Sequence, residues 1–197
     1  NLEEENYIDL ATFYREDRKY DDAVSVLEEI YNDNAENLEF CKLLGDTYYD
    51  AGRFDQALGV YGKALQLHPE SFDLYYAMGM TYTMLNDFNS AKDYYDKAAK
   101  INSYKDEIAN LNLGQIQLIL GEYDEAQKYF EKLIMSDDDK ISANAYYNLA
   151  KIKLIKGEME LAAKYCNLAI ELDPEIKKRI INDKRFELIL DKLSIEK

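Results

Sequence analysis

Small side chains recur along this sequence at a period of 34 residues, and such a period restricts the fold to stacked copies of one short unit. The alanines that carry the period are Ala23, Ala57, Ala91, Ala126 and Ala162. Their successive spacings are 34, 34, 35 and 36 residues, so one residue and then two are inserted between the later copies. Gly45 and Gly79 repeat the spacing of 34 at another phase.

The five copies, here called repeats 1 to 5, cover residues 4–37, 38–71, 72–105, 107–140 and 143–176. Each repeat is expected to be a pair of helices, because the chain holds only 8 glycines and 2 prolines and its aromatic side chains recur at helical spacing. Position 8 of each repeat is glycine or alanine and position 20 is always alanine, so the two helices can approach closely. Gly52, Gly121 and Gly157 lie where the first helix should end in a left-handed residue.

Repeat 2 is the clearest copy, and its characteristic residues are Leu44-Gly45, Tyr48, Gly52, Phe54, Ala57, Tyr61, Ala64 and Pro69. This pattern resembles the tetratricopeptide repeat, a helix–turn–helix unit with small residues at its eighth, twentieth and twenty-seventh positions. The resemblance covers residues 4–176. It implies an all-α fold, a right-handed α-solenoid superhelix of five such units.

The tail, residues 177–197, does not continue the repeat, because its frame would place Asp183 and Lys184 at the two packing positions. Its apolar residues instead fall on one face of a helix, with lysines and arginines between them. Asp173-Pro174 is a plausible start for this helix and Asp183 a plausible restart. We expect a C-terminal capping helix that covers repeat 5.

Composition excludes several classes of function. The formal net charge of −15 argues against nucleic-acid binding, which needs clustered lysine and arginine. No apolar run is long enough for membrane insertion. The chain begins at Asn1 without a signal-type segment, which suggests a piece of a longer protein whose targeting segment or anchor would lie upstream. We expect a cytoplasmic location, and the abundance of Asn, Lys, Ile and Tyr hints at a bacterial source.

Residues that could support catalysis or hold a metal or cofactor are scarce. His68 is expected in a surface loop, and Cys41 and Cys166 fall at core positions as buried structural thiols. The run 137–139 is three aspartates but lacks the glycine and distal glutamate of a calcium loop, so a solvated loop is the better interpretation. We therefore predict no enzyme activity, no catalytic residues, no metal site and no cofactor.

The informative surface is the groove lined by the first helices of the repeats. Helical spacing directs positions 2, 5, 6, 9, 12 and 13 of each repeat toward it. These positions are acidic in repeats 1 and 2 and become apolar, with amides, toward repeat 5. An apolar floor in so charged a protein indicates a partner. The predicted partner-binding residues are Tyr76, Met80, Leu111, Asn112, Ile119, Tyr147, Asn148 and Ile155, with Asp46 and Asp50 at the acidic end.

Asn112 and Asn148 occupy position 6 of adjacent repeats. One asparagine amide can donate to a peptide carbonyl and accept from a peptide N–H, and the resemblance supports the idea, because some peptide-binding relatives use such rows. Ordinary polar groove residues are the alternative. Relatives that clamp a C-terminal carboxylate use a different set, Lys and Asn, then Asn, then Lys and Arg. The corresponding residues from repeat 2 onward are Lys42, Asp46, Ala77, Ile108 and Asn112. Only Lys42 matches, so that clamp is not expected here.

These observations predict a non-catalytic protein–protein interaction scaffold that holds a protein or peptide segment in the groove. Residues 1–37 carry twelve acids and three bases, a net charge of −9, which favours a partner with a basic flank; acidity that serves solubility alone is the alternative. Two other functions stay open. The chain could be a structural module that self-assembles into a homo-oligomer, or a regulatory domain of a larger protein.

Overall fold

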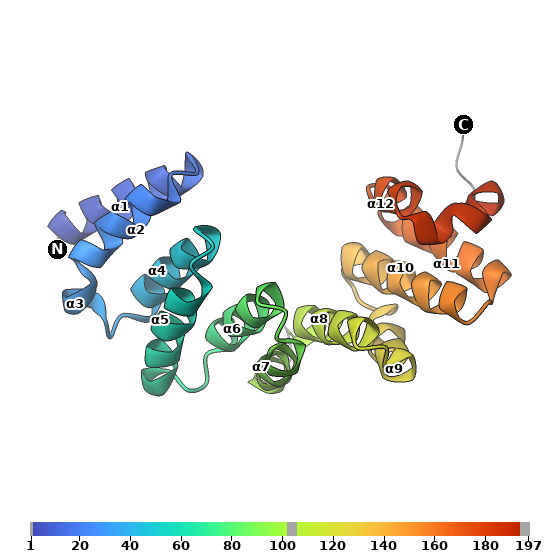
Figure 1. Cartoon of the computed structure of the whole chain (residues 1–197), viewed down its shortest axis with the longest axis horizontal. Coiled ribbons are helices and arrows are strands. Elements are labelled where there is room, and N and C mark those ends of the chain that lie inside the picture. Colours follow the sequence, from blue (N-terminus) through green and yellow to red (C-terminus); the bar gives the residue numbers. More distant parts are fainter. Residues whose placement is uncertain (1, 102–105, 194–197) are drawn as a thin grey trace. The chain divides into compact units, whose positions relative to one another are not determined.

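The computed structural model describes residues 2–101 and 106–193, with side chains from residue 5 onward. Every secondary-structure element in these two ranges is a helix (Figure 1). The chain divides into two compact units, Asn1–Ile101 and Asn102–Lys197, called here the N-terminal and the C-terminal unit. Each unit is built from antiparallel helix pairs, which confirms the predicted all-α solenoid architecture.

The N-terminal unit holds three helix pairs and one short additional helix. Its elements are α1 (Leu2–Glu16), α2 (Tyr20–Glu29), α3 (Tyr31–Asn34), α4 (Leu38–Asp50), α5 (Phe54–Leu67), α6 (Phe72–Met84) and α7 (Phe88–Ile101). The C-terminal unit holds two pairs and the tail. Its elements are α8 (Asp106–Ile119), α9 (Tyr123–Leu133), α10 (Asp139–Ile155), α11 (Met159–Leu172), α12 (Ile176–Asn182) and the 3-10 helix η1 (Lys184–Lys192).

The close approach inside each pair is set by the small residues at position 8 and position 20. The alanines at position 20 of all five repeats have 0% exposure. A Cβ atom added at Gly45 would lie 2.2 Å from Cε1 of Tyr61, and one at Gly79 would lie 2.7 Å from Cδ1 of Tyr95. The aromatic ring at position 24 therefore fills the space that the glycine leaves.

The turn between the helices of a pair needs a left-handed residue in all five repeats, at position 15. Gly52, Gly121 and Gly157 have φ of 73°, 82° and 78°, as predicted. Arg18 and Asn86 take the same place with φ of 58°, which the sequence reasoning missed because only glycines were considered. Alignment of the repeats by position would have found both, since asparagine also tolerates this region.

Replacing Gly52 by alanine is expected to lower the free energy of unfolding by about 1 kcal/mol, because a Cβ is strained at positive φ. No atom lies within 4 Å of the added Cβ, so the cost is conformational and not steric. Gly52→Asn should cost less than half as much. Urea unfolding followed by circular dichroism measures both. Equal costs for the two variants would contradict this explanation.

The second helices differ in length with the residue at position 27. Where it is alanine, in α5, α7 and α11, the helix has 14 residues, whereas α2 and α9 have 10 and 11. At the ends of the two short helices the residue is Ile30 or Leu133, and its carbonyl accepts a side-chain hydrogen bond, from Asn34 Nδ2 at 3.0 Å or from Ser142 Oγ at 3.1 Å. The Leu133 carbonyl also accepts from the backbone N–H of Ser136 at 3.2 Å, so backbone and side chain share this helix end.

The tail forms two helices and not one continuous helix over 177–197, and Asp183, the predicted restart, is the N-cap of the second. Its helix α12 begins at Ile176 and is followed by η1, and residues 194–197 lie outside the described ranges. The break falls at Asp183, whose backbone is extended and whose Oδ1 accepts from the N–H of Arg185. A side chain that caps the second piece competes with continuation of the first. Ile176, Ile180 and Phe186 are 0–1% exposed and pack with residues of α10 and α11.

The cysteines and the histidine have the structural places expected for them. Cys41 and Cys166 are buried, and burial raises the pKa of the Cys166 thiol to about 12. His68 ends α5, with Nε2 3.2 Å from the carbonyl oxygen of Glu36. In the run of three aspartates, Asp138 caps α10 by accepting from the N–H groups of Lys140 and Ile141.

Candidate binding site

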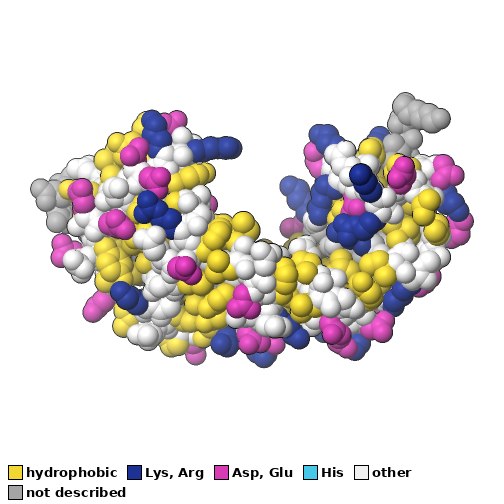
Figure 2. Space-filling view, viewed as in Figure 1, with side chains coloured by type: hydrophobic (Ala, Val, Ile, Leu, Met, Phe, Trp, Pro, Cys, Tyr) yellow, Lys and Arg dark blue, Asp and Glu magenta, His cyan; other side chains and the backbone are white. Residues whose placement is uncertain are grey.

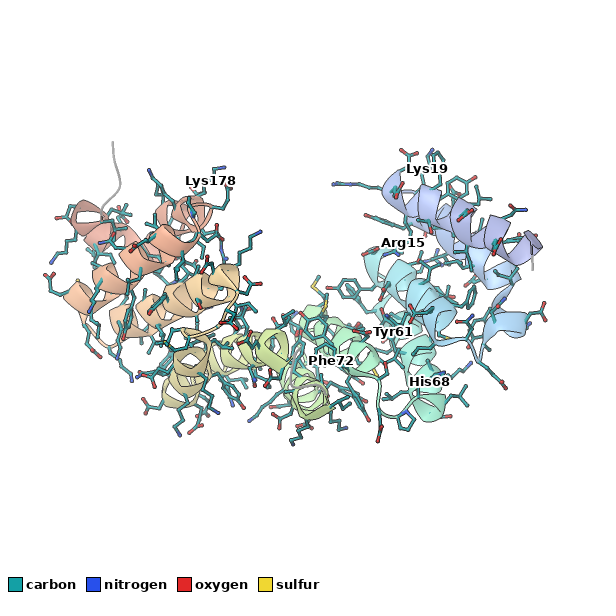
Figure 3. All side chains as sticks on the ribbon, turned by 180° about the vertical axis from the view of Figure 1, so that it is seen from behind. Arg15, Lys19, Tyr61, His68, Phe72 and Lys178 are labelled. Carbon is teal, nitrogen blue, oxygen red and sulfur yellow. The ribbon has the colours of Figure 1, made fainter. Side chains whose placement is uncertain are left out.

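A pocket of about 340 Å³ opens on the first-helix face of the N-terminal unit. Helices α1, α4 and α6 line it, and α5, the second helix of repeat 2, contributes one side chain. Figure 3 labels Arg15 of α1 and Tyr61 of α5. The lining residues are Arg15, Lys42, Asp46, Tyr49, Asp50, Tyr61, Asp73, Tyr76, Ala77 and Met80.

All but one of these residues occupy the positions predicted to face the groove. Tyr61, at position 24, is the exception, and the sequence reasoning assigned it only to the core. Four predicted partner-binding residues come together here: Asp46, Asp50, Tyr76 and Met80. Because the same helical positions face the groove in every repeat, residues from three repeats come together on one surface.

Two ion pairs tie neighbouring repeats together at the pocket. Arg15 Nη2 donates to Asp50 Oδ2 at 2.6 Å, and Lys42 Nζ donates to Asp73 Oδ2 at 3.2 Å. Burial disfavours the Lys42 charge, but the hydrogen bond to Asp73 and the charges of Asp73, Glu39 and Asp46 together outweigh it and raise the lysine pKa. Both pairs are partly exposed, so each contributes little to stability and an incoming group can compete for them.

Asp46 is the most enclosed carboxylate of the pocket. Burial raises its pKa, although the bond from Tyr61 and the nearby charges of Arg15 and Lys42 act in the opposite direction. The Tyr61 hydroxyl donates to Asp46 Oδ1 at 2.6 Å, and burial raises the pKa of this phenol strongly. Tyr61 therefore stays a neutral donor and fixes the orientation of the carboxylate.

The formal charges of the pocket do not balance. Three carboxylates, Asp46, Asp50 and Asp73, face two cations, Arg15 and Lys42, which leaves one negative charge. One guest cation would neutralise the pocket.

The aromatic walls are held in place by other rings. Tyr49 meets Phe54 edge-on at 5.6 Å between centroids. Tyr76 stacks on Phe72 at 5.7 Å and lies 5.5 Å from Tyr95. Rings fixed in this way can accept an apolar or cationic guest with little loss of conformational entropy.

The other six predicted residues lie in the C-terminal unit, and they differ widely in their exposure to solvent. Ile119 and Ile155 are 57% and 47% exposed, whereas Tyr147 and Asn148 are only 5% and 1% exposed. Leu111 and Asn112 are half-buried. The amide of Asn148 is engaged within α10: Nδ2 donates to the carbonyl of Asn144 at 2.9 Å, and Oδ1 accepts from Lys151 Nζ at 3.1 Å.

Tyr147 is buried because the tail covers it. Its ring stacks on Phe186 of η1 at 5.5 Å, and its hydroxyl donates to Asp183 Oδ2 at 3.1 Å. The alternation of apolar and basic residues in the tail predicted a cap. It did not predict which groove residues the cap would cover.

In the described ranges no cluster of three or more His, Cys, Asp or Glu side chains is arranged to hold a metal ion. Within the same ranges, no helix combines the length and apolarity that crossing a membrane requires.

Four family models match the sequence, one described as "TPR repeat" and three as "Tetratricopeptide repeat". They cover residues 45–86, 14–62, 111–175 and 72–104. The chain belongs to the tetratricopeptide repeat family. No curated protein matches the sequence significantly.

Solved tetratricopeptide repeat structures share the fold. The MamA protein is 26% identical, with a TM-score of 0.72 over 87% of this chain and 92% of MamA. YrrB, described as a TPR protein with an unusual peptide-binding site, is 23% identical, with a TM-score of 0.67 over 95% of this chain and 91% of YrrB. A putative kinesin light chain of Podosopora anserina is 13% identical, with a TM-score of 0.72 over 88% and 96%. The family and the fold support a protein–protein interaction scaffold.

Proposed function

We propose that this chain acts by binding and not by catalysis, and that a partner protein inserts a cationic side chain into the pocket of the N-terminal unit. The unbalanced charge of the pocket carries this proposal, since three carboxylates face only two cations. The net charge of −9 in residues 1–37 would attract a basic segment from a distance.

The guest ammonium or guanidinium group would lie between the Asp46 carboxylate and the rings of Tyr49 and Tyr76. A cation over an aromatic face contributes about 0.5–2 kcal/mol, more when water is excluded. Met80 and the same rings would contact neighbouring apolar side chains of the partner segment. The segment itself would lie across α1, α4 and α6.

Selection from a displayed library of random twelve-residue peptides tests this proposal. The selected peptides should be enriched in lysine and arginine, and Asp46→Asn and Tyr76→Ala should each weaken binding about tenfold. Asp55→Asn is the matched control, because Asp55 is an exposed carboxylate of α5 outside the pocket. Selection without basic enrichment, or equal weakening by the control, would refute it.

The asparagine row of the C-terminal unit stays part of the proposal, as the place where a partner backbone is held. Asn112, Ile119 and Ile155 offer half-buried or exposed side chains there. Asn148 would have to exchange its bonds to Asn144 and Lys151 for bonds to the partner. Capture of the same partner by the parent chain and by Asn112→Ala/Asn148→Ala would remove the row from the mechanism.

Self-assembly is the second candidate, favoured by exposed apolar side chains of α1. Phe13 is 60% exposed and Leu10 is 42% exposed on this helix, and a second copy could cover them. Size-exclusion chromatography with light scattering distinguishes the two functions. A dimer that Phe13→Ser converts to a monomer would support self-assembly.

A cytoplasmic location in a bacterial cell also stays a proposal. Two free, buried thiols are compatible with a reducing compartment. Fractionation of the source cells would test it.

A further inference from the structure

A group of cations lies beside the cap in the C-terminal unit and shares no residue with the pocket described above. Lys151 Nζ of α10 is 4.1 Å from the ring centroid of Tyr147, and Arg179 Cζ of α12 is 4.6 Å from the same centroid. Figure 2 shows Lys and Arg side chains gathered over this part of α10 and α12. One aromatic ring thus holds two like charges near each other.

Both cations have only neutral partners for their hydrogen bonds. Lys151 donates to Asn148 Oδ1 at 3.1 Å, and Arg179 Nη1 donates to Asn144 Oδ1 at 2.6 Å. Within residues 106–193, neither forms a salt bridge with a carboxylate. This is notable in a chain with 39 acidic residues against 24 basic ones.

The nearest carboxylate, Asp183, is already committed. Its two oxygens accept from Arg185 Nε and Nη2, at distances of 2.6–3.1 Å, and one also accepts from the Tyr147 hydroxyl. Lys151, Arg179 and Arg185 together face this single carboxylate. The local excess is therefore two positive charges.

The cost of this arrangement falls on Lys151. Burial and the repulsion of Arg185 and Arg179 lower its pKa to about 8, although Asp183 opposes the shift. A half-buried lysine without an anionic partner is a costly feature for a structural role alone. An anion placed between Lys151 and Arg179 would relieve the repulsion.

We infer that Lys151 and Arg179 form a binding site for a side-chain carboxylate of an acidic segment in a partner protein. One carboxylate has two oxygens, so it can accept from the ammonium and from the guanidinium group at the same time. A polyanion such as a nucleic acid fits poorly, because a phosphate backbone needs many more clustered cations than the two that this site offers. The site does not depend on the pocket of the N-terminal unit, and each can fail without the other.

A fluorescein-labelled hexaglutamate peptide, with both ends blocked, is the probe for this site. Its anisotropy should show saturable binding at low salt. Lys151→Gln and Arg179→Gln should each weaken the binding about tenfold, and Arg179→Lys should retain part of it. Lys178→Gln is the matched control: it removes the same charge from α12, but Lys178 is exposed and pairs with Glu175. The control should stay within about twofold of the parent.

A second measurement separates a site from diffuse attraction. Carbon-13 NMR of the Lys151 side chain should show its pKa rising by about one unit when hexaglutamate binds. Absence of binding, an unchanged Lys151 titration, or equal weakening by Lys178→Gln would each overturn the inference. So would binding of inorganic phosphate but not hexaglutamate, which would assign the site to small anions. Self-association that Arg179→Gln abolishes would assign it to a second copy of this chain.

Discussion

Gly45→Ala is expected to lower the free energy of unfolding of the N-terminal unit by about 2 kcal/mol, although alanine is the better helix former. The added Cβ would lie 2.2 Å from Cε1 of Tyr61. That ring cannot move aside easily, because Tyr61 is 1% exposed and its hydroxyl bonds to Asp46. Overpacking of this severity costs about 3 kcal/mol, and helix propensity returns about 1 kcal/mol.

Gly59→Ala is the matched control for this prediction. Gly59 lies within α5, and a Cβ there meets no atom within 4 Å. The control should stabilise the protein by about 0.5–1 kcal/mol. Urea denaturation followed at 222 nm measures both variants. A stabilising effect of Gly45→Ala would mean that the pair of helices can separate at no cost, against the packing described above.

Phe186→Ala is expected to lower the free energy of unfolding of the C-terminal unit by about 4 kcal/mol. The ring is 0% exposed and stacks on Tyr147 of α10. Its loss would leave a cavity between η1 and the last repeat, and substitutions of this kind cost about 3–5 kcal/mol. The same denaturation experiment measures the effect.

Leu188→Ala is the control in the same helix, since Leu188 is 69% exposed. Its cost should be under about 0.5 kcal/mol. Equal, small effects of the two variants would show that the tail does not stabilise repeat 5 and would end its assignment as a cap.

The repeat period predicted the helix pairs because each pair is a local structure. Small residues at positions 8 and 20, with a large side chain at position 24, define how two helices close on each other within 34 residues. The early ends of α2 and α9 could not be predicted in the same way. The side-chain hydrogen bonds at these ends come from Asn34 and Ser142, and Ser142 belongs to the next helix pair.

The candidate site was predicted unevenly. Helical spacing alone was enough to predict four residues of the pocket, Asp46, Asp50, Tyr76 and Met80. The contribution of Tyr61 from beneath, and the cations Lys151 and Arg179 on Tyr147, were missed. Tyr61 and Arg179 each meet a residue of another helix, Asp46 and Tyr147, only after folding. Lys151 lies in α10 itself, four residues after Tyr147.

The sequence by itself determined the family, the helix pairs and the left-handed turns at the three glycines, since all of these follow from periodic positions. Tertiary structure alone decided which of the predicted groove positions stay open. Ile119 stays exposed, whereas Tyr147 is covered by Phe186, a residue of the tail outside the repeat pattern. Exposure of a side chain depends on what packs against it from elsewhere in the chain, and no periodic pattern records that.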